Sequence, residues 1–378
     1  MRQVRATPRP TPGPGDVLRL VRPNLRGRRP YVGPGSPEAL ARKYGFSLDR
    51  LVKLDANENP YGPSPRVFEA LARPLPYHRY PEPDSETLRR ALAEYVGASP
   101  DQIIVGAGSD EVILLALQAF LGPGTALVEP APTFVMYRLT AEVVGARVIT
   151  VPRDPQTYQA DPEQVVAVLG PRVKVVVFCS PNNPTGNLES ERTVRQVLDT
   201  GVFVLVDEAY YEYSGHTFVP LISRYPNLGV LRTFSKWAGL AGLRVGYGVF
   251  SPEVARVVAG IKPPFNVSLA GQVAALESLA DREYLMATVR KTIAERERLF
   301  RELGRFDYLR VLPSAANFIY AEVCRGSARQ LTEALAQEGI LVRQFDVPPP
   351  RGGIRISVGL PEENDRLLEA LGRIQPED

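Results

Sequence analysis

The chain has 378 residues, and its 45 basic and 42 acidic side chains leave a formal net charge of +3 that is spread along the sequence. The sequence holds no concentrated basic tract of the kind that binds nucleic acid, and no apolar run of the roughly 18 residues that a membrane span needs. Its two histidines are too few for the usual zinc sites or for serine–histidine–aspartate hydrolysis, so we expect no metal and a small-molecule substrate.

The N-terminal residues are rich in proline, glycine and arginine. Residues 1–17 lack the apolar core of a secretion signal, and we expect them to form a flexible tail. Residues 18–54 are expected to pack with the C-terminal part of the chain. The two cysteines, Cys179 and Cys324, lie in separate apolar runs, which favours buried thiols over a disulfide and a reducing, cytoplasmic compartment.

Strands and helices alternate through the middle of the chain. Gln102–Gly106 is a short apolar strand, and a helix is predicted from near Ser109 to Leu121. Further strands are predicted at residues 125–129, 147–151, 173–179, 202–206, 230–233 and 245–250, some separated by helices such as Glu189–Leu198. Such nearly continuous runs of Val, Ile and Leu indicate strands that are covered on both faces. We therefore predict an α/β fold with a mostly parallel, seven-stranded sheet and helices on both faces, in a large domain at residues 55–265.

The pattern changes after Pro263-Pro264. Helices are predicted at about residues 268–280 and 282–303, followed by a strand at 317–323, a helix at 328–338, strands at 340–345 and 354–358, and a last helix from Glu362. Together these elements predict a smaller α+β domain at residues 266–378.

Polar residues stand at the ends of several predicted strands, where ligands bind in doubly wound sheets. At the first strand–helix turn, Gly106-Ala-Gly-Ser-Asp110 offers backbone N–H groups and a helix N-terminus to an anion. Glu111 stands where a dinucleotide fingerprint has its third glycine, which argues against that class of site. Asp110 and Glu111 are equally explained as ordinary partners of the helix dipole.

Two further strand ends carry polar groups. Ser180-Pro-Asn-Asn-Pro-Thr-Gly186 predicts a rigid turn that presents the Asn183 amide above the sheet, and Asp207 and Tyr210 follow the buried strand at 202–206. A carboxylate in that position needs a partner. The partner is either a cation, such as the pyridinium nitrogen of pyridoxal phosphate, or backbone groups and a nearby arginine.

Lys236 lies among hydroxyls and glycines at the end of an apolar strand, in a chain that otherwise favours arginine. Since arginine cannot form an imine, a lysine in this position predicts a Schiff-base lysine, and Thr233, Ser235 and Arg244 predict an adjoining phosphate site. The alternative is an exposed loop lysine with no catalytic role.

In this order and spacing, these strand ends resemble the pyridoxal-phosphate enzymes of fold type I, the aspartate-aminotransferase superfamily. Motifs near both ends of the chain are similar to those of the histidinol-phosphate aminotransferases: Arg22-Pro-Asn-Leu, Lys53–Pro65, Ala315-Ala-Asn-Phe and Ile354–Asn364. Aromatic-amino-acid aminotransferases and threonine-phosphate decarboxylases share most of these motifs. The resemblance covers the chain from about Leu18 to its end.

The resemblance implies pyridoxal 5'-phosphate as the cofactor and a role for each matching residue. Lys236 would form the imine with the cofactor, Asp207 would pair with its ring nitrogen, and Tyr210 would act with Asn183 at the ring oxygen. Phe134 would stack on the ring, where family members often carry tyrosine. The residues implied around the phosphate are Gly108, Ser109, Asp110 through its backbone, Thr233, Ser235 and Arg244, with Tyr61 from the second subunit of a homodimer.

The implied reaction moves an amino group between L-histidinol phosphate and 2-oxoglutarate in histidine biosynthesis. Arg355 would meet the glutamate carboxylate in one half-reaction and the phosphate in the other, while Arg343 and Tyr31 would add contacts beside Asn183. Arg343 could instead be a surface strand residue, and Tyr31 a packing residue. An aromatic-amino-acid aminotransferase with the same site, a pyridoxal-phosphate sensor and a catalytically silent binder are the competing functions.

Overall fold

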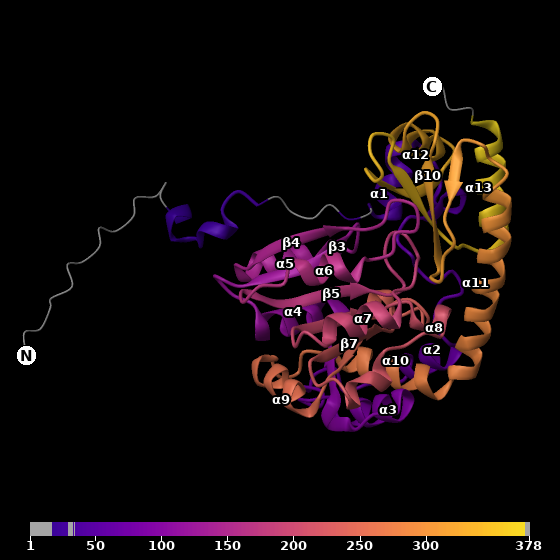
Figure 1. Cartoon of the computed structure of the whole chain (residues 1–378). Coiled ribbons are helices and arrows are strands. Elements are labelled where there is room, and N and C mark those ends of the chain that lie inside the picture. The colour runs from indigo at the N-terminus through magenta and orange to yellow at the C-terminus, as the bar shows by residue number, and fades with distance from the viewer. Residues whose placement is uncertain (1–16, 29–32, 34, 375–378) are drawn as a thin grey trace, which may run out of the picture. The chain divides into compact units, whose positions relative to one another are not determined.

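The structure, a computed structural model, describes residues 17–28, 33 and 35–374 (Figure 1). The predicted tail lies outside the described residues except for Val17, and so does Tyr31. The chain divides into two compact units, Met1–Gly33 and Pro34–Asp378. In the first unit the described residues form two short 3-10 helices, η1 (Val17–Leu20) and η2 (Pro23–Leu25). The second unit holds all the strands described below.

A seven-stranded sheet forms the larger part of the second unit. Its strands, in spatial order, are β2 (Ile103–Gly106), β8 (Gly246–Val249), β7 (Leu228–Thr233), β6 (Phe203–Asp207), β5 (Val173–Cys179), β3 (Ala126–Ala131) and β4 (Arg147–Pro152). Only β8 runs against its neighbours, so the other strands all point the same way. The predicted mostly parallel sheet is confirmed.

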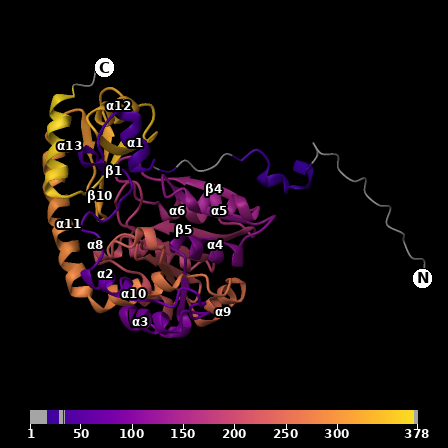
Figure 2. The ribbon, with the colours of Figure 1, turned by 180° about the vertical axis from the view of Figure 1, so that it is seen from behind.

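Helices cover both faces of this sheet, which Figures 1 and 2 show from opposite sides. In β5, Val175 and Val177 pack into the apolar cluster on one face and Val176 and Phe178 into the cluster on the other. One cluster is completed by α4 (Ser109–Phe120), α5 (Met136–Val144) and α9 (Pro252–Ile261); the other by α3 (Glu86–Val96), α6 (Pro162–Ala167), α7 (Glu191–Leu198) and α10 (Leu269–Ala280). Strands apolar on both faces require this double cover because neither face can be left in water.

A second sheet has five strands in the order β1 (Val52–Leu54), β11 (Ile340–Phe345), β12 (Gly353–Ser357), β10 (Phe318–Val323) and β9 (Leu309–Val311). Its apolar cluster includes residues of α12 (Ala328–Gln337) and α13 (Pro361–Arg373). Strand β1 pairs in parallel with β11, so an N-terminal segment joins a sheet built from C-terminal strands. The division into domains at residues 54 and 265 stays a prediction.

The long helix α11 (Arg282–Leu303) runs from the helices beside the larger sheet to the smaller sheet (Figure 1). It contacts α8 (Tyr211–Ser214) beside the larger sheet, and β9, β10 and α13 in the smaller part. The remaining described elements are α1 (Pro37–Tyr44), α2 (Pro65–Leu71), η3 (Leu48–Arg50), η4 (Pro100–Gln102), η5 (Val219–Ser223) and η6 (Ala241–Leu243). Among the described helices, none is both long enough and apolar enough to cross a membrane.

Two sequence expectations need correction. The prediction of a buried thiol is confirmed for Cys179, but it is wrong for Cys324, which is exposed. Cys324 follows the last residue of β10, where the chain leaves the sheet, so the apolar run ends before it. The helix expected from Glu189 begins at Glu191, because the Ser190 side chain accepts a hydrogen bond from the Thr193 N–H and caps it.

Candidate active site

The strand ends that carry the predicted polar groups all lie at one edge of the seven-stranded sheet. The parallel strands β2, β3, β5, β6 and β7 end there, and the antiparallel β8 begins there. The structure therefore brings together the turns after Gly106, Ala131, Cys179, Asp207 and Thr233, as the sequence predicts.

Lys236 follows β7 at this edge, and its side chain is partly buried. Its Nζ donates a hydrogen bond to the carbonyl oxygen of Ala56, at 3.2 Å. Desolvation, with the positive charge of Arg355 as the second cause, lowers the pKa of Lys236 to about 8. An appreciable fraction of the amine is then uncharged near neutral pH, which is the form that acts as a nucleophile or base.

Asp207 is the last residue of β6 and is 2% exposed. Its Oδ2 accepts a hydrogen bond from the Tyr137 hydroxyl at 2.6 Å, and its Oδ1 accepts one from the Ala209 N–H at 3.0 Å. Burial raises the pKa of Asp207 to about 6, although both hydrogen bonds favour the charged form. The two described hydrogen-bond partners of Asp207 are uncharged. A cation that binds beside this carboxylate would therefore not have to displace an ion pair with either of them.

Tyr137 is a site residue that the sequence analysis missed. It lies on α5, fully buried, and burial raises the pKa of its phenol well above the usual value, so the hydroxyl stays protonated and donates to Asp207. The ring of Phe134 lies edge-on to it, with centroids 5.6 Å apart and an interplanar angle of 81°. The available signal was its place in the first turn of a helix that follows the Phe134 turn at this sheet edge.

Tyr210 is also buried, and its hydroxyl accepts a hydrogen bond from Nδ2 of Asn57 at 3.0 Å. Asn57 has a positive φ of 53° and was not given a role from the sequence. Its backbone N–H donates to the Ser357 hydroxyl at 2.7 Å, and its carbonyl accepts from Nδ2 of Asn317 at 3.1 Å. Asn57 thus connects Tyr210 to the five-stranded sheet.

An anion cradle lies at the N-terminus of α4. Gly108 has a φ of 81°, and a Cβ on it would come within 2.4 Å of Nη2 of Arg244, so only glycine lets the guanidinium approach. Arg244 Nη2 pairs with Asp110 Oδ2 at 3.0 Å, and its Nη1 lies 3.5 Å from the Ser235 hydroxyl. Backbone N–H groups, a hydroxyl and a guanidinium at a helix N-terminus suit a phosphate group.

The other predicted cradle residues lie in the same place. Ser109 begins α4, and its backbone nitrogen is so close to Gly246 that a Cβ there would lie 2.2 Å away. The Thr233 hydroxyl is 3.0 Å from that of Ser235 and accepts a hydrogen bond from the Ser235 N–H at 3.1 Å. All of the residues predicted for the phosphate from this chain therefore converge.

Asn183 and Arg355 meet although they belong to different sheets. Nη1 of Arg355, on β12, donates to Oδ1 of Asn183 at 2.7 Å, and its Nη2 donates to the Asp55 carbonyl at 2.7 Å. Arg343 on β11 is the direct cross-strand partner of Arg355, so both arginines project from one face of the five-stranded sheet. The two predicted anion-binding arginines are thus neighbours.

In the single chain, the ring of Tyr61 faces α11. The ammonium of Lys291, on α11, lies 5.6 Å from the centroid of the Tyr61 ring. The predicted contribution of Tyr61 to a second subunit's phosphate site therefore stays a prediction.

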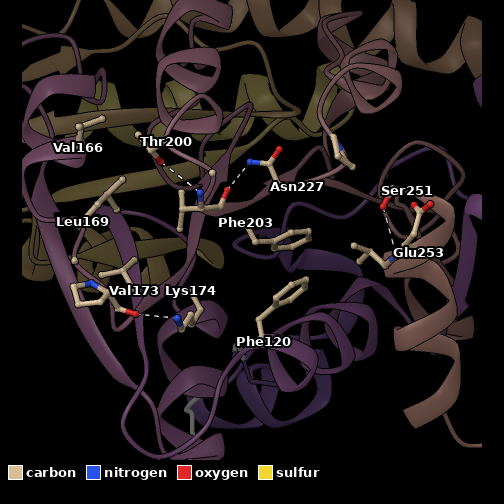
Figure 3. A pocket seen from close by; sticks show the side chains of 16 residues that line it. Phe120, Val166, Leu169, Val173, Lys174, Thr200, Phe203, Asn227, Ser251 and Glu253 are labelled. Carbon is tan, nitrogen blue, oxygen red and sulfur yellow. Dashed lines mark hydrogen bonds between the residues drawn. The ribbon is translucent and has the colours of Figure 1, made fainter.

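A cavity of about 1050 Å³ opens at the opposite edge of the seven-stranded sheet, where β5 and β6 begin (Figure 3). Its apolar wall includes the stacked rings of Phe120 and Phe203, with centroids 4.0 Å apart. Two of its polar side chains bond to nearby backbone carbonyls. Lys174 donates to the Pro171 carbonyl at 2.9 Å, and Asn227 donates to the Val202 carbonyl at 2.8 Å. We therefore assign the active site to the other edge, where polar groups converge.

Comparison with known proteins agrees with this assignment. Residues 49–371 match the family described as aminotransferase class I and II. The histidinol-phosphate aminotransferase of Dehalococcoides mccartyi (strain ATCC BAA-2266 / KCTC 15142 / 195) is 44% identical over 359 residues, which are 95% of this chain and 99% of that protein. That of Roseiflexus castenholzii is 45% identical over 370 residues, 96% of this chain and 100% of that protein.

The fold is shared with solved structures. The crystal structure of histidinol-phosphate aminotransferase from Sinorhizobium meliloti in complex with pyridoxal-5'-phosphate has a TM-score of 0.83 to this chain at 31% sequence identity, and the match covers 92% of this chain and 95% of that one. The predicted fold is therefore confirmed, together with the resemblance to the pyridoxal-phosphate enzymes of fold type I.

Proposed function

The chain belongs to the aminotransferase class I and II family, and from that membership we propose that it transfers the amino group of L-histidinol phosphate to 2-oxoglutarate. The products are imidazole acetol phosphate and L-glutamate, and the reaction serves histidine biosynthesis. Relatives that carry this function in their names are 44% and 45% identical over nearly the whole chain.

One observation carries the proposal. A lysine amine with a pKa lowered to about 8 stands at the same sheet edge as a buried carboxylate and a glycine-lined anion cradle. These groups match three parts of pyridoxal phosphate, which are its aldehyde, its ring nitrogen and its phosphate.

The residues present fit that cofactor. Lys236 would hold it covalently through Nζ, Asp207 would face the ring nitrogen, and Gly108, Ser109, the Asp110 backbone, Thr233, Ser235 and Arg244 would hold the phosphate. Phe134 would lie against the ring, with Asn183 and Tyr210 at the ring oxygen. The bound cofactor supplies an electron sink that stabilises negative charge at the substrate Cα.

Residues of this chain would set the charge beside the cofactor and transfer the protons. Tyr137 and the Ala209 N–H favour the ionised form of the Asp207 carboxylate, which would keep a proton on a cofactor nitrogen that faces it. Lys236 would move a proton to and from the substrate Cα through its Nζ, as a general base and acid with a pKa near the working pH.

Arg355 provides the anion site for the substrate. Its guanidinium fork suits a carboxylate and a phosphate ester alike, which explains how one pocket accepts glutamate and histidinol phosphate in turn. Arg343 lies beside it on the next strand. Tyr31, which was predicted to contact the imidazole side, lies outside the described residues.

We further propose a cytoplasmic homodimer in which Tyr61 reaches the phosphate of the neighbouring subunit. The free state of both cysteines fits a reducing compartment. An active site that draws on two chains explains why Tyr61 lies beside Lys291 in a single chain.

Single-turnover absorbance measurements on the pyridoxal-phosphate form test the substrate. L-Histidinol phosphate should react at least about tenfold faster than phenylalanine or tyrosine, because two arginines favour the phosphate dianion. A faster reaction with phenylalanine would instead assign an aromatic-amino-acid aminotransferase.

The assignment of Lys236 as the lysine that holds the cofactor can be tested by chemical labelling, with a second lysine of the same chain as the control. Borohydride reduction should fix the cofactor to the peptide that contains Lys236, and Lys236→Ala should remove both the label and the turnover. Lys262, whose side chain is 6% exposed, is a matched lysine whose peptide should stay unlabelled.

A further inference from the structure

Tyr158 lies in the loop between β4 and α6 and is held in an unusual backbone conformation. Its φ is 56° and its side chain is 3% exposed. A bulky residue rarely adopts a positive φ, and it does so only where surrounding contacts dictate the conformation. Its carbonyl oxygen accepts hydrogen bonds from Nη1 of Arg153 at 2.9 Å and from Nδ2 of Asn187 at 3.0 Å. The backbone of Tyr158 is thereby fixed to the turn that carries Asn183.

The side chain of Tyr158 is fixed to the other sheet. Its hydroxyl donates to Oε1 of Glu322 on β10 at 2.6 Å. Arg310 on β9 grips the same carboxylate with Nε at 2.6 Å from Oε2 and Nη2 at 2.5 Å from Oε1. Arg310 also donates to the carbonyls of Pro155 and Gln156, at 3.1 and 3.2 Å. We call Tyr158, Glu322 and Arg310 the Tyr158 latch.

The latch holds the strand next to the one that carries the substrate arginine. Tyr320 on β10 is the direct cross-strand partner of Arg355, and Glu322 lies two residues further along the same strand. Alternate residues of a strand share a face, so Tyr320, Glu322 and Arg355 all project from the same side. The ring of Tyr158 packs edge-on against Tyr320, with centroids 6.4 Å apart and an interplanar angle of 84°.

Two connections therefore join the turn after β5 to neighbouring strands of the five-stranded sheet, β12 and β10. One is the direct bond between Arg355 and Asn183, and the other runs through Asn187, Tyr158 and Glu322. A substrate anion that binds Arg355 competes with the Asn183 amide oxygen for the guanidinium. During that exchange, the second connection still holds the turn after β5 to β10, the neighbour of β12, together with the hydrogen bond from the Ala315 N–H to the Gly186 carbonyl at 2.8 Å.

We infer that Tyr158 is a positioning residue for the substrate anion. The Tyr158 latch holds β10, the neighbour of β12, and thereby fixes the position of Arg355 relative to Asn183. The inference rests on the proposed function for the role of Arg355. The ligands concerned are carboxylates and phosphate monoesters. A bracing role alone would change stability without changing anion affinity.

The test compares Tyr158→Phe with a matched control, Tyr308→Phe. Tyr308 is likewise buried, but its hydroxyl donates to the Leu371 carbonyl at 2.8 Å, away from the latch. In the pyridoxal-phosphate form, dissociation constants for succinate and inorganic phosphate are read from the change in visible absorbance. Tyr158→Phe should weaken both anions about five- to tenfold, and Tyr308→Phe by less than about twofold. The absorbance without anion should match that of the unchanged enzyme.

A second variant keeps the test decisive if Tyr158→Phe folds poorly. Arg310→Lys changes a side chain that is 40% exposed and removes the grip on Glu322 and on the two carbonyls. It should also weaken both anions, by about two- to threefold, and hydrogen exchange at the backbone amides of β12 should accelerate. Unchanged affinity in both latch variants overturns the inference, and so does an equal loss in Tyr308→Phe.

Failure of the proposed function would look different. An unchanged enzyme that binds these anions but does not convert histidinol phosphate would refute the proposed substrate. Even then, the dissociation constants for succinate and inorganic phosphate, compared between the latch variants and Tyr308→Phe, would still show whether Tyr158 positions the anion site.

Discussion

At the scale of single residues, the buried Asp207 carboxylate links the site to the stability of the protein. Burial raises its pKa to about 6, while Tyr137 and the Ala209 N–H act in the opposite direction. The cofactor-free protein therefore binds an extra proton relative to the unfolded chain between the ordinary carboxyl value of 3.8 and about 6. Asp207 thus favours folding at low pH, and this contribution is lost as the pH rises through about 6.

We predict that Asp207→Asn removes this dependence. The free energy of unfolding of cofactor-free protein, measured by denaturant titration at several pH values, should fall less steeply between pH 4 and 6 in the variant than in the unchanged protein. The difference over this range should be about 2 kcal/mol. Glu208 and Glu212, whose pKa values burial also raises, remain in both proteins and cancel in the comparison.

Tyr137→Phe provides the opposite change. It removes a hydrogen bond that lowers the pKa of Asp207, so the pH dependence should extend to higher pH than in the unchanged protein. Identical curves for the unchanged protein and both variants would show that Asp207 does not titrate in this range.

At the scale of elements, a buried ion pair holds the loops that carry the site. Nη1 of Arg153 lies 2.5 Å from Oε1 of Glu189, and both side chains are 0% exposed. Arg153 Nε also donates to the Pro132 carbonyl at 3.1 Å, just before Phe134, and the Glu189 N–H donates to the Ser180 hydroxyl at 3.0 Å. The pair thereby ties the turn after β3 to the turn after β5.

We predict that Arg153→Met costs about 3 to 5 kcal/mol of unfolding free energy, because Glu189 is left as an uncompensated buried charge. Arg153→Met combined with Glu189→Leu should recover much of the loss, since both charges are then gone. The matched control is Arg195→Met, which breaks the exposed pair with Glu191 and should cost less than about 1 kcal/mol. Equal losses for the buried and exposed pairs in denaturant titrations would contradict this account.

At the scale of the whole molecule, the proposed homodimer predicts complementation between inactive chains. Lys236→Ala and Tyr61→Ala should each lose most of their turnover. When the two are unfolded together and refolded, a mixed dimer contains one site with Lys236 from one chain and Tyr61 from the other. Mixing should therefore restore about a quarter of the unchanged activity.

A second mixture serves as the control. Lys236→Ala refolded with Asp207→Asn should recover nothing, because Lys236 and Asp207 are proposed to serve the site of their own chain. If the mixture with Tyr61→Ala also stays inactive, Tyr61 does not act across the subunit boundary.

The sequence alone determined the fold class and most of the catalytic edge. Continuous Val and Ile runs predicted the strands of the larger sheet, and the polar residues that interrupt them, such as Asp207 and Lys236, marked one edge. This succeeds because a parallel sheet brings strand ends together whatever the details of its packing. The same reasoning failed for Cys324, since an apolar run does not reveal where a strand leaves its sheet.

Only the tertiary structure decided which side chains touch across the two sheets. Arg355 and Asn183 are 172 positions apart, Tyr158 and Glu322 are 164 apart, and Asn57 and Tyr210 are 153 apart. Local patterns specify the element on which a residue lies and the face it occupies. The partner that it meets depends on how distant elements pack, which is set by the apolar surfaces of the whole chain and not by the residues beside it.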